Sequence, residues 1–479
     1  MALLTKEEYI ETLKKYRPNV YIQGLKIEKV WESPFFATSI NQIGATYEFA
    51  LDPQYREHSA VKSPLTGEDV PRNTLHIQNS VEDSLIKVNL TREVTKRRIC
   101  TFCLSNFLSV TWAFLYDTDK KHGTNYHERF KNFVKHMQRN DFRLAWGMMD
   151  PKGDRRLSPS QQERPTDLRI SERNDEGIIV SGAKIHTTYG PVMHEVIAVP
   201  CRALSEDDRD YAVSFAVPVD TKGITFICRP APGPRHHVDM ASPLSSKFIG
   251  VEAMTIFDHV FVPWDRVFLC GEWDMCGTLP SYFAALHRQS KCSCSAGHAD
   301  LMAGTCSLLS RVNGLSPKVG HINDKIMDIA MAAEVAHGCA IGSAINGEMH
   351  PSGVWMPSAL IANAGLHHIR SSLGTHISHI HDIAGGLLTT MPIEDDMKNP
   401  ETKKLIDYYL RGGSDYTTEE RLRALELGRD LAASNLCGSI MGFTINAAGS
   451  PVTNKITVSR LYDLKAMEKI AEDISGIRR

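Results

Sequence analysis

The stretch ISERNDEGIIVSGAKIHTT, from Ile170 to Thr188, sets the fold class of this chain. It holds short β-branched runs on either side of the turn-forming residues NDEG, a pattern that is typical of strands joined by a tight turn. The same pattern recurs in four further runs, HEVIAVPCRAL (194–204), DYAVSFAVPV (210–219), GITFICRP (223–230) and EAMTIFDHVFVPWDRVFL (252–269). We therefore predict a block of antiparallel strands over residues 141–272.

Both flanks of this block are predicted to be helical. Ser84–Gly123 carries apolar residues at helical spacing and ends in glycine, and His321–Ile345 is a long stretch of the same kind. A third stretch starts at Thr417 with the Thr-x-x-Glu pattern of a capping box. The polar run 393–405, IEDDMKNPETKKL, reads as an irregular surface loop instead.

These elements predict an α+β chain in three parts. The expected order is an N-terminal helical domain at 1–140, a middle antiparallel, barrel-like β domain at 141–272 and a C-terminal helical bundle at 273–479. A chain of 479 residues is long enough for more than one core.

The composition is that of an ordinary globular protein. Hydrophobic residues make up 42% of the chain and charged residues 23%, and the formal net charge is −2. Such a balance argues against nucleic-acid and membrane-surface partners. No apolar run reaches the roughly 18 residues of a membrane span, and the first residues read as an amphipathic helix. We therefore expect a cytoplasmic protein, in which the eleven cysteines do not form disulfides.

Cysteine and histidine gather in AALHRQSKCSCSAGHADL (284–301), a predicted helix. His287 and Cys294 are seven residues apart and can share one helical face. Cys100 and Cys103 form a Cys-x-x-Cys pair in another predicted helical segment. If the two segments pack together, three thiolates and one imidazole suit a structural zinc or an iron–sulfur cluster. Otherwise these cysteines are core residues.

Two further stretches are candidates for function. The run 367–386, HHIRSSLGTHISHIHDIAGG, is dense in histidine and is interpreted as a helix that lines an active site or a subunit interface. The run 148–160, MMDPKGDRRLSPS, is broken by proline and glycine, and its Lys152 and Arg155 suit a phosphate or pyrophosphate. A solvated turn is the alternative. No Gly-x-Gly-x-x-Gly follows a strand, so a Rossmann site is not supported.

Several short motifs together resemble the 4-hydroxyphenylacetate 3-hydroxylase family of flavoproteins, whose fold is acyl-CoA dehydrogenase-like. The motifs are DPQY (52–55), HGTNYH (122–127), MDPKGDR (149–155), DYAVSFA (210–216), HRQS (287–290), DIAGGL (382–387), TTEER (417–421) and AGSP (448–451). The resemblance runs nearly from end to end. It is strongest to the branch of the family that dehydrates hydroxyacyl-CoA thioesters such as 4-hydroxybutyryl-CoA and isomerises vinylacetyl-CoA.

The resemblance implies FAD in each subunit of a homotetramer and a [4Fe–4S] cluster close to the flavin. The implied cluster ligands are Cys100, Cys103, His287 and Cys294, with Cys292 as a bystander. The first cysteine pair is one residue tighter here than the Cys-x-x-x-Cys of that branch. The implied flavin contacts are Met149, Lys152, Asp154, Arg155, Thr188, Gly385 and Gly386. His287 and Glu252 are the implied catalytic residues.

The implied activity is that of an FAD- and iron–sulfur-dependent dehydratase and isomerase, which converts a hydroxyacyl-CoA such as 4-hydroxybutyryl-CoA to crotonyl-CoA by a radical route. The alternative is an FAD-dependent aromatic hydroxylase of the 4-hydroxyphenylacetate 3-monooxygenase type, which needs no cluster. Lys291, Ser295 and Phe443 depart from the dehydratase pattern. Their positions near the reacting centre bear on which acyl group is accepted.

Overall fold

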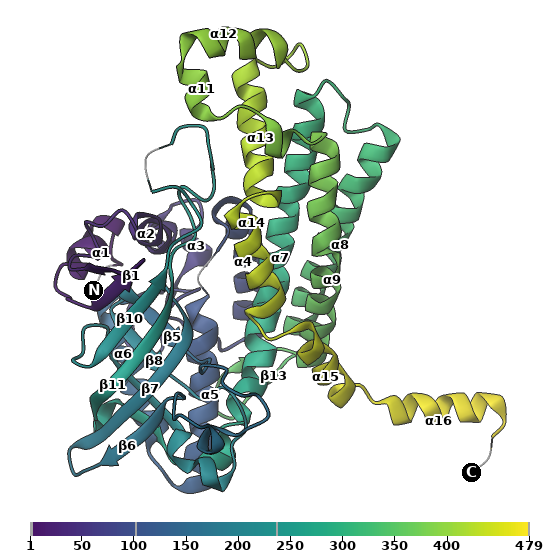
Figure 1. Ribbon diagram of the computed structural model, residues 1–479. Helices are drawn as coiled ribbons and strands as arrows, with labels where there is room; N and C mark the ends of the chain where they lie inside the picture. Colours follow the sequence, from purple (N-terminus) through teal and green to yellow (C-terminus); the bar gives the residue numbers. More distant parts are fainter. Residues whose placement is uncertain (1–2, 101–102, 236–237, 478–479) are drawn as a thin grey trace.

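The computed structural model describes residues 3–100, 103–235 and 238–477, and it combines β-sheets with a long helical bundle (Figure 1). The longer helices are α1 (Lys6–Leu13), α2 (Ala37–Leu51), α4 (Val81–Arg98), α5 (Leu104–His122), α6 (Tyr126–Asn140), α7 (Thr278–Val312), α8 (Gly320–Ile345), α9 (Ala359–Ala384), α12 (Pro400–Tyr409), α13 (Thr418–Ala432), α14 (Asn435–Asn446), α15 (Pro451–Leu461) and α16 (Leu464–Ser475). The short helices are α3 (Arg56–Ser59), α10 (Leu387–Thr390) and α11 (Glu394–Lys398). The described helices include none with the length and apolar character needed to cross a membrane.

The strands form two main sheets. A six-stranded sheet has the order β2 (Leu25–Ile27), β1 (Asn19–Ile22), β10 (Ile224–Arg229), β11 (Glu252–Pro263), β7 (Gly177–Thr188) and β6 (Arg169–Arg173). A four-stranded sheet has the order β12 (Val267–Cys270), β9 (Val213–Pro218), β8 (Glu195–Ala198) and β5 (Leu144–Gly147). Two small hairpins pair β3 (Ala60–Lys62) with β4 (Asp69–Pro71) and β13 (Glu348–Met349) with β14 (Trp355–Met356).

The turn that joins β6 to β7 forms as the sequence predicts. Asn174 Oδ1 accepts hydrogen bonds from the backbone N–H groups of Glu176 and Gly177, each at 2.9 Å. An asparagine that bonds its own downstream backbone is a common start for a tight turn. The two strands on either side then pair antiparallel, so the central prediction from Ile170–Thr188 is confirmed.

Two strand pairs are parallel, which the sequence pattern did not predict. β5 pairs parallel with β8, and β1 pairs parallel with β10. β1 and its neighbour β2 come from the first 30 residues, so the six-stranded sheet takes two strands from outside the predicted strand block. These two strands are three and four residues long and too short to leave a clear alternating pattern.

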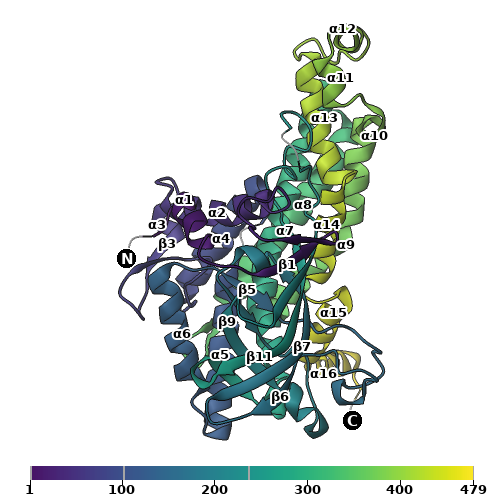
Figure 2. The ribbon, with the colours of Figure 1, turned by 60° about the vertical axis from the view of Figure 1, so that its left-hand side comes forward.

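The bundle is organised around α7, which has 35 residues and packs against α4, α5, α8, α9 and α13. Figure 2 shows α7, α8, α9 and α13 running side by side above the sheets. Helix α13 starts with the predicted capping box: Thr417 Oγ1 accepts from the N–H of Glu420 at 3.1 Å, and the Glu420 carboxylate accepts from the N–H of Thr417 at 2.7 Å.

Two sequence predictions about helices are wrong. The stretch Ser84–Gly123 is not one helix, because α4 ends at Arg98, Ile99 has a left-handed φ of 64°, and α5 starts only at Leu104. The run 393–405 is not an irregular loop either, because it holds α11 and the first part of α12. Asn399 caps α12 by accepting from the N–H of Glu401 at 2.9 Å, and a proline at the first helical position favours the start of a helix.

A glycine sets the distance between α7 and α4. A Cβ atom built on Gly297 would overlap Thr95 Oγ1 and would lie 2.6 Å from the Arg92 carbonyl oxygen. On the same helix, a Cβ atom on the exposed Gly304 would meet nothing within 4 Å. The absence of a side chain at 297 therefore allows the two helices to approach closely.

We expect Gly297→Ala to lower the free energy of unfolding by about 1–3 kcal/mol, which is the usual cost of overpacking. The matched control Gly304→Ala is expected to leave stability unchanged or to raise it by up to about 1 kcal/mol, because alanine is the better helix former. Thermal melts of both variants at one scan rate test this. Equal melting temperatures for the two variants would contradict the close approach of α4 and α7.

Candidate active site

One face of α7 carries four chemically active side chains. His287, Lys291, Cys294 and His298 follow one another at spacings of four, three and four residues, which keeps them on one side of a helix. All four are buried, with at most 7% of each residue exposed. The Lys291 ammonium donates to Cys294 Sγ at 3.6 Å. The sequence prediction that His287 and Cys294 share a face is confirmed.

The connection between α4 and α5 lies against this face. His298 Nε2 donates to the carbonyl oxygen of Ile99 at 2.5 Å, which fixes the residue directly before Cys100. Cys100 and Cys103 flank the connection and are partly buried. The sequence placed them within a helix, and this was wrong because the helical path is broken at Ile99. A cysteine pair in a connection has more freedom to turn both thiols toward one centre.

Cys100 and Cys103 lie near different titratable side chains. Burial raises the pKa of Tyr189 well above its usual value, and the nearby Cys100 and Glu252 add to the rise. Burial also lowers the pKa of Lys87 to about 7, and Cys103 opposes this fall. Cys100 therefore lies toward Tyr189 and the sheet that carries Glu252, and Cys103 lies toward Lys87 on α4.

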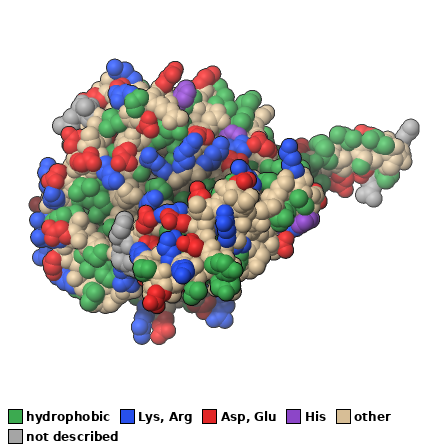
Figure 3. Space-filling view, turned by 90° about the horizontal axis from the view of Figure 1, so that it is seen from above, with side chains coloured by type: hydrophobic (Ala, Val, Ile, Leu, Met, Phe, Trp, Pro, Cys, Tyr) green, Lys and Arg blue, Asp and Glu red, His purple; other side chains and the backbone are tan. Residues whose placement is uncertain are grey.

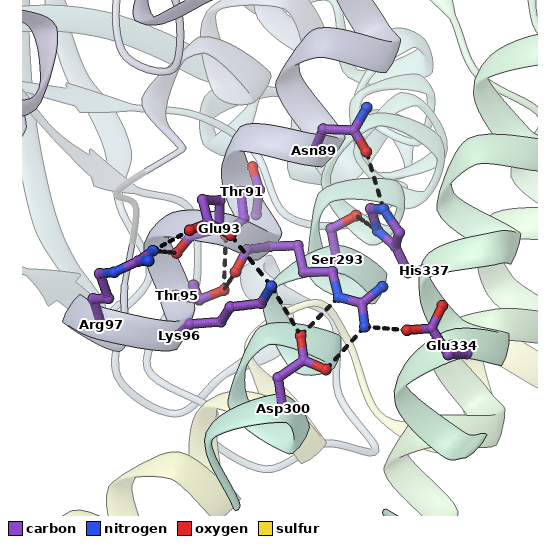
Figure 4. Close-up of polar contacts among 11 residues, drawn as sticks. Asn89, Thr91, Glu93, Thr95, Lys96, Arg97, Ser293, Asp300, Glu334 and His337 are labelled. Carbon is purple, nitrogen blue, oxygen red and sulfur yellow. Dashed lines mark hydrogen bonds and ion pairs between the residues drawn. The ribbon is translucent and has the colours of Figure 1, made fainter. Parts of the chain in front are cut away.

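A polar clamp holds α4 in place on the bundle (Figure 4). Arg92 of α4 donates two hydrogen bonds to the Asp300 carboxylate of α7, at 2.7 and 2.8 Å, and one to Glu334 of α8 at 2.5 Å. The ring of His337 on α8 bonds Ser293 of α7 at 3.2 Å and Asn89 of α4 at 3.0 Å. Such two-pronged contacts between arginine and carboxylate have a fixed geometry. The clamp therefore positions the end of α4 from which the cysteine connection starts.

Four buried cationic side chains surround His287. Each is at most 6% exposed, and none takes part in an ion pair among the described residues; they are Lys87, Arg288, Lys291 and Arg370. Burial first, and then these four charges, lower the pKa of His287 to about 3, so its imidazole is neutral. The Nε and Nη2 atoms of Arg370 and the Nδ1 atom of His287 have no hydrogen-bond partner. Buried charge without a counter-charge is costly, so this centre is suited to an anionic group.

Aromatic rings hold the imidazole of His287. Its ring centroid lies 4.7 Å from that of Phe283, in a stacked arrangement, and 5.0 Å from that of Phe107. Phe107 in turn stacks on Trp146 of β5 at 4.8 Å. A neutral imidazole with an unpaired nitrogen is a competent ligand for iron.

The residues predicted to contact the flavin are in part close together. Thr188 and Glu252 are register partners on β7 and β11, and Thr188 Oγ1 donates to the Glu252 carboxylate at 2.9 and 3.0 Å. Met149 forms a bridge with Ile185 on β7, and Lys152 lies near enough to lower the pKa of His186. Burial raises the pKa of Glu252 to about 7, which is well placed for a group that exchanges protons near neutral pH.

The remaining predicted flavin contacts lie either in the exposed loop that holds Lys152 or at the other end of the bundle. The Asp154 carboxylate pairs with the exposed Arg156 at 2.6 Å, and Arg155 is exposed in the same loop. Gly385 and Gly386 form the turn between α9 and α10, with φ values of 64° and 83°, at the end of the bundle that Figure 2 shows far from β7. One chain therefore does not bring these glycines beside Thr188.

The predicted ligands do not form a site for a single metal ion in the described part of the chain. The described residues include no group of three His, Cys, Asp or Glu arranged to hold one metal ion. In an iron–sulfur cluster each protein ligand binds a different iron, so the ligands stand further apart. Cys292 donates from Sγ to the Ala362 carbonyl oxygen of α9 at 3.2 Å. Its side chain therefore points away from the ligand face, by which we mean the face of α7 that carries His287, Lys291, Cys294 and His298.

Three residues of the centre were missed by the sequence analysis: Lys87, Tyr189 and Arg370. Tyr189 has a left-handed φ of 60°, which is a strained conformation that is frequent at functional sites. No sequence pattern predicts this conformation. Lys87 and Arg370 each lie on a helix face whose other residues are buried. This position on the helix is the feature of the sequence that could have indicated their burial. The histidines around Arg370 are the residues that the sequence pattern indicated. One of them, His379, pairs with Asp328 at 3.2 Å on the outside of the bundle.

Comparisons with known proteins match the whole chain. Residues 5–269 match the family model "4-hydroxyphenylacetate 3-hydroxylase N terminal", and residues 276–476 match the model for its C terminal part. The chain is 34% identical to 4-hydroxybutyryl-CoA dehydratase/vinylacetyl-CoA-Delta-isomerase of Clostridium aminobutyricum, covering 99% of this chain and 100% of that protein.

Two solved structures are also similar. An oxygen-tolerant archaeal 4-hydroxybutyryl-CoA dehydratase from N. maritimus has a TM-score of 0.94 and 31% identity, with 100% of this chain and 96% of that chain covered. The oxygenase component of 4-hydroxyphenylacetate 3-monooxygenase, complexed with FAD, has a TM-score of 0.87 and 22% identity, with 98% of each chain covered.

The raised pKa of Glu252 predicts a pH-dependent effect of Glu252→Gln on stability. A folded-state pKa of about 7, above the ordinary 4.5, means that the folded protein binds this proton more tightly than the unfolded chain does. Ionised Glu252 therefore costs stability increasingly between pH 4.5 and 7, and the cost stays constant above pH 7.

Relative to wild type, Glu252→Gln should be neutral near pH 4.5 and stabilising by about 1–2 kcal/mol at pH 8, a figure discounted from about 1.4 kcal/mol per pKa unit because the side chain is partly accessible. Melting temperatures measured at both pH values test this, with the exposed Glu57→Gln as the control. A variant that is equally or less stable than wild type at pH 8 would refute the shift.

Proposed function

This chain belongs to the 4-hydroxyphenylacetate 3-hydroxylase family, and from that premise we propose that it is an FAD- and [4Fe–4S]-dependent dehydratase and isomerase of a hydroxyacyl-CoA such as 4-hydroxybutyryl-CoA. The observation that carries the proposal is the buried, carboxylate-free cationic centre around His287, beside the ligand face of α7. A thiolate-ligated cluster is an anionic group that such a centre can stabilise. The full-length similarity to two dehydratases supports the same activity.

The proposed cluster ligands are Cys100, Cys103, His287 and Cys294. Their elements converge because Gly297 admits α4, the Arg92 clamp holds it, and His298 ties Ile99 to α7. The orphaned Nδ1 atom of His287 supports a role as the one non-thiolate ligand. Cys292, which bonds toward α9, stays a core residue in this proposal.

The proposed flavin site is the end of the β7–β11 pair at which Thr188 and Glu252 are register partners, with Met149 and Lys152 near the same part of β7. The loop cations Lys152 and Arg155 are exposed, pair with no carboxylate in the described part of the chain, and suit the flavin phosphates. When bound, FAD supplies one-electron chemistry and a cluster iron supplies a Lewis acid for the leaving hydroxyl group.

The residues of the chain handle the protons in this proposal. Glu252, with a pKa of about 7, accepts the proton from the carbon next to the thioester, and Thr188 orients its carboxylate. His287 is neutral and accepts the second proton, at the carbon that becomes part of the double bond. Returning one of the two protons to the leaving hydroxyl group releases water, and returning the other to the carbon that lost the hydroxyl group completes crotonyl-CoA, so no external oxidant is consumed. Phe107, Phe283 and Trp146 line the imidazole and exclude water from it.

A second candidate function is aromatic hydroxylation with reduced FAD and oxygen. The likeness to the oxygenase component of 4-hydroxyphenylacetate 3-monooxygenase favours it, although that likeness at 22% identity speaks for the fold alone. This reaction gives no purpose to the thiols proposed as cluster ligands or to the buried cations that lack a carboxylate partner among the described residues. The two functions differ in their need for iron, so iron content separates them.

We also propose a homotetramer in the acyl-CoA dehydrogenase-like arrangement, with the three parts at 1–140, 141–272 and 273–479. Helix α16 supports an assembly, because it stands away from the body and none of its residues is buried (Figure 3). Its exposed apolar residues are Leu464, Met467, Ile470 and Ile474. In an assembly, Gly385 and Gly386 of one subunit could reach the flavin of another, which one chain alone does not allow.

We expect anaerobically prepared protein to contain FAD, iron and acid-labile sulfide. Cys294→Ala removes a proposed ligand and should lower iron content and dehydratase activity at least tenfold while FAD remains. Cys292→Ala is the matched control, two residues away on the same helix, and should keep its iron. Iron, sulfide and flavin analyses of the three proteins measure this. Wild-type protein with FAD but without iron would overturn the cluster and leave hydroxylation as the leading function.

Light scattering of the FAD-bound protein should give the mass of four chains. Ile470→Asp together with Ile474→Asp places two charges on the apolar face of α16 and should weaken the assembly. The control Lys465→Glu changes the charge of an exposed residue on the same helix and should leave the mass unchanged. A stable wild-type monomer with bound FAD would rule out the tetramer.

A further inference from the structure

Lys291 occupies a singular position on the ligand face of α7. It lies between His287 and Cys294 in the helical stripe, it is only 6% exposed, and its ammonium group donates to Cys294 Sγ at 3.6 Å. That sulfur is the hydrogen-bond partner that the structure gives to this ammonium. A buried lysine that is aimed at a cysteine three residues further along the helix needs an explanation other than solvation.

The groups that face Lys291 offer it no carboxylate. On its own helix they are His287 and His298, and the charge of Lys291 lowers the pKa of both imidazoles. From α4 and α9, Lys87 and Arg370 direct further positive charge toward the same imidazole of His287. Of the described side chains, the one that the Lys291 ammonium contacts is Cys294, whose sulfur carries a negative charge when it binds iron.

The other cations of the centre have different tasks. Arg288 donates to the Ala448 carbonyl oxygen at 2.8 Å and to Thr457 Oγ1 at 3.0 Å, so it holds the turn between α14 and α15. Arg370 donates to the Gly449 carbonyl oxygen at 2.9 Å and supports the same turn. Lys87 donates to Gln78 Oε1 at 3.0 Å. Lys291 alone among the four has a sulfur as its partner.

From this geometry we infer that Lys291 is a positioning residue that sets the reduction potential of the proposed cluster through an N–H···S hydrogen bond to the Cys294 thiolate. The inference rests on the cluster of the proposed function. A positive charge and a hydrogen bond at a ligating sulfur stabilise the more electron-rich state of a cluster, which raises its potential. The bond also anchors the cluster at its Cys294 corner.

The experiment compares variants of the full-length protein that was reconstituted with iron, sulfide and FAD. Lys291→Met removes both the charge and the donor, Lys291→Gln keeps a donor without the charge, and Lys291→Arg keeps the charge. Arg288→Met is the matched control, because it removes a buried cation near His287 whose described hydrogen-bond partners are all oxygen atoms. The readouts are the midpoint potential of the cluster, from anaerobic titration followed by electron paramagnetic resonance, and the rate at which a chelator removes iron.

We expect Lys291→Met to shift the midpoint potential to more negative values and to speed iron removal several-fold. Lys291→Gln and Lys291→Arg should fall between Lys291→Met and wild type, and Arg288→Met should change both quantities less. Wild-type iron with an unchanged potential in both Lys291→Met and Lys291→Gln would overturn the inference while leaving the proposed function intact. If Lys291→Met does not retain iron, Lys291→Gln and Lys291→Arg decide the question. A wild-type protein that binds no cluster would overturn both.

Discussion

Buried positive charge without a matching carboxylate is the constraint on which the rest of this structure depends. Lys87, Arg288, Lys291 and Arg370 are each at most 6% exposed, and their charges meet at the imidazole of His287. A protein does not keep such a centre without a counter-charge. Hydrogen bonds to carbonyl oxygens and amides relieve part of the cost, but the Nε and Nη2 atoms of Arg370 have no hydrogen-bond partner among the described residues. An anionic cofactor bound in this centre would supply the counter-charge that the four cations lack.

The architecture serves this centre by bringing distant segments to one face of α7. The clamp at Arg92, the missing side chain at Gly297 and the bond from His298 to the Ile99 carbonyl oxygen each act between α4 and α7. Together they place Ile99, the residue before Cys100, against the His298 end of this face. The β-sheets contribute Thr188 and Glu252 from the other side. Tyr189 lies near both Glu252 and Cys100, whose charges add to the rise of its pKa. Helical bundle and sheet thus meet where the chemistry is proposed to occur.

Local signals in the sequence predicted local structure well. The run Ile170–Thr188 predicted paired strands, and Thr417 predicted the start of α13, because turn and capping chemistry depend on residues three or four apart. The break at Ile99 was not predictable from the sequence, because no glycine or proline marks it and the bond that stabilises it comes from His298, 199 residues away. The parallel pairing of β1 with β10 also joins segments that are far apart in the sequence, and strands this short leave no pattern from which the pairing could be predicted.

Of the candidate site, the shared face of His287 and Cys294 followed from helical spacing alone. The cationic residues around them did not, because a lysine or arginine on a helix is ordinarily solvated, and burial is decided by the packing of other elements. Lys87 and Arg370 are buried by helices that lie far away in the sequence. The flavin residues required the family resemblance, and the separation of Gly385 from Thr188 became visible only in three dimensions.

The most direct measurement of the central claim is an anomalous difference map, recorded at the iron absorption edge from crystals grown anaerobically. The account predicts one compact iron peak between α7 and the α4–α5 connection, in contact with His287, Cys294, Cys100 and Cys103. A map without iron there, with FAD bound at Thr188 and Glu252, would contradict it.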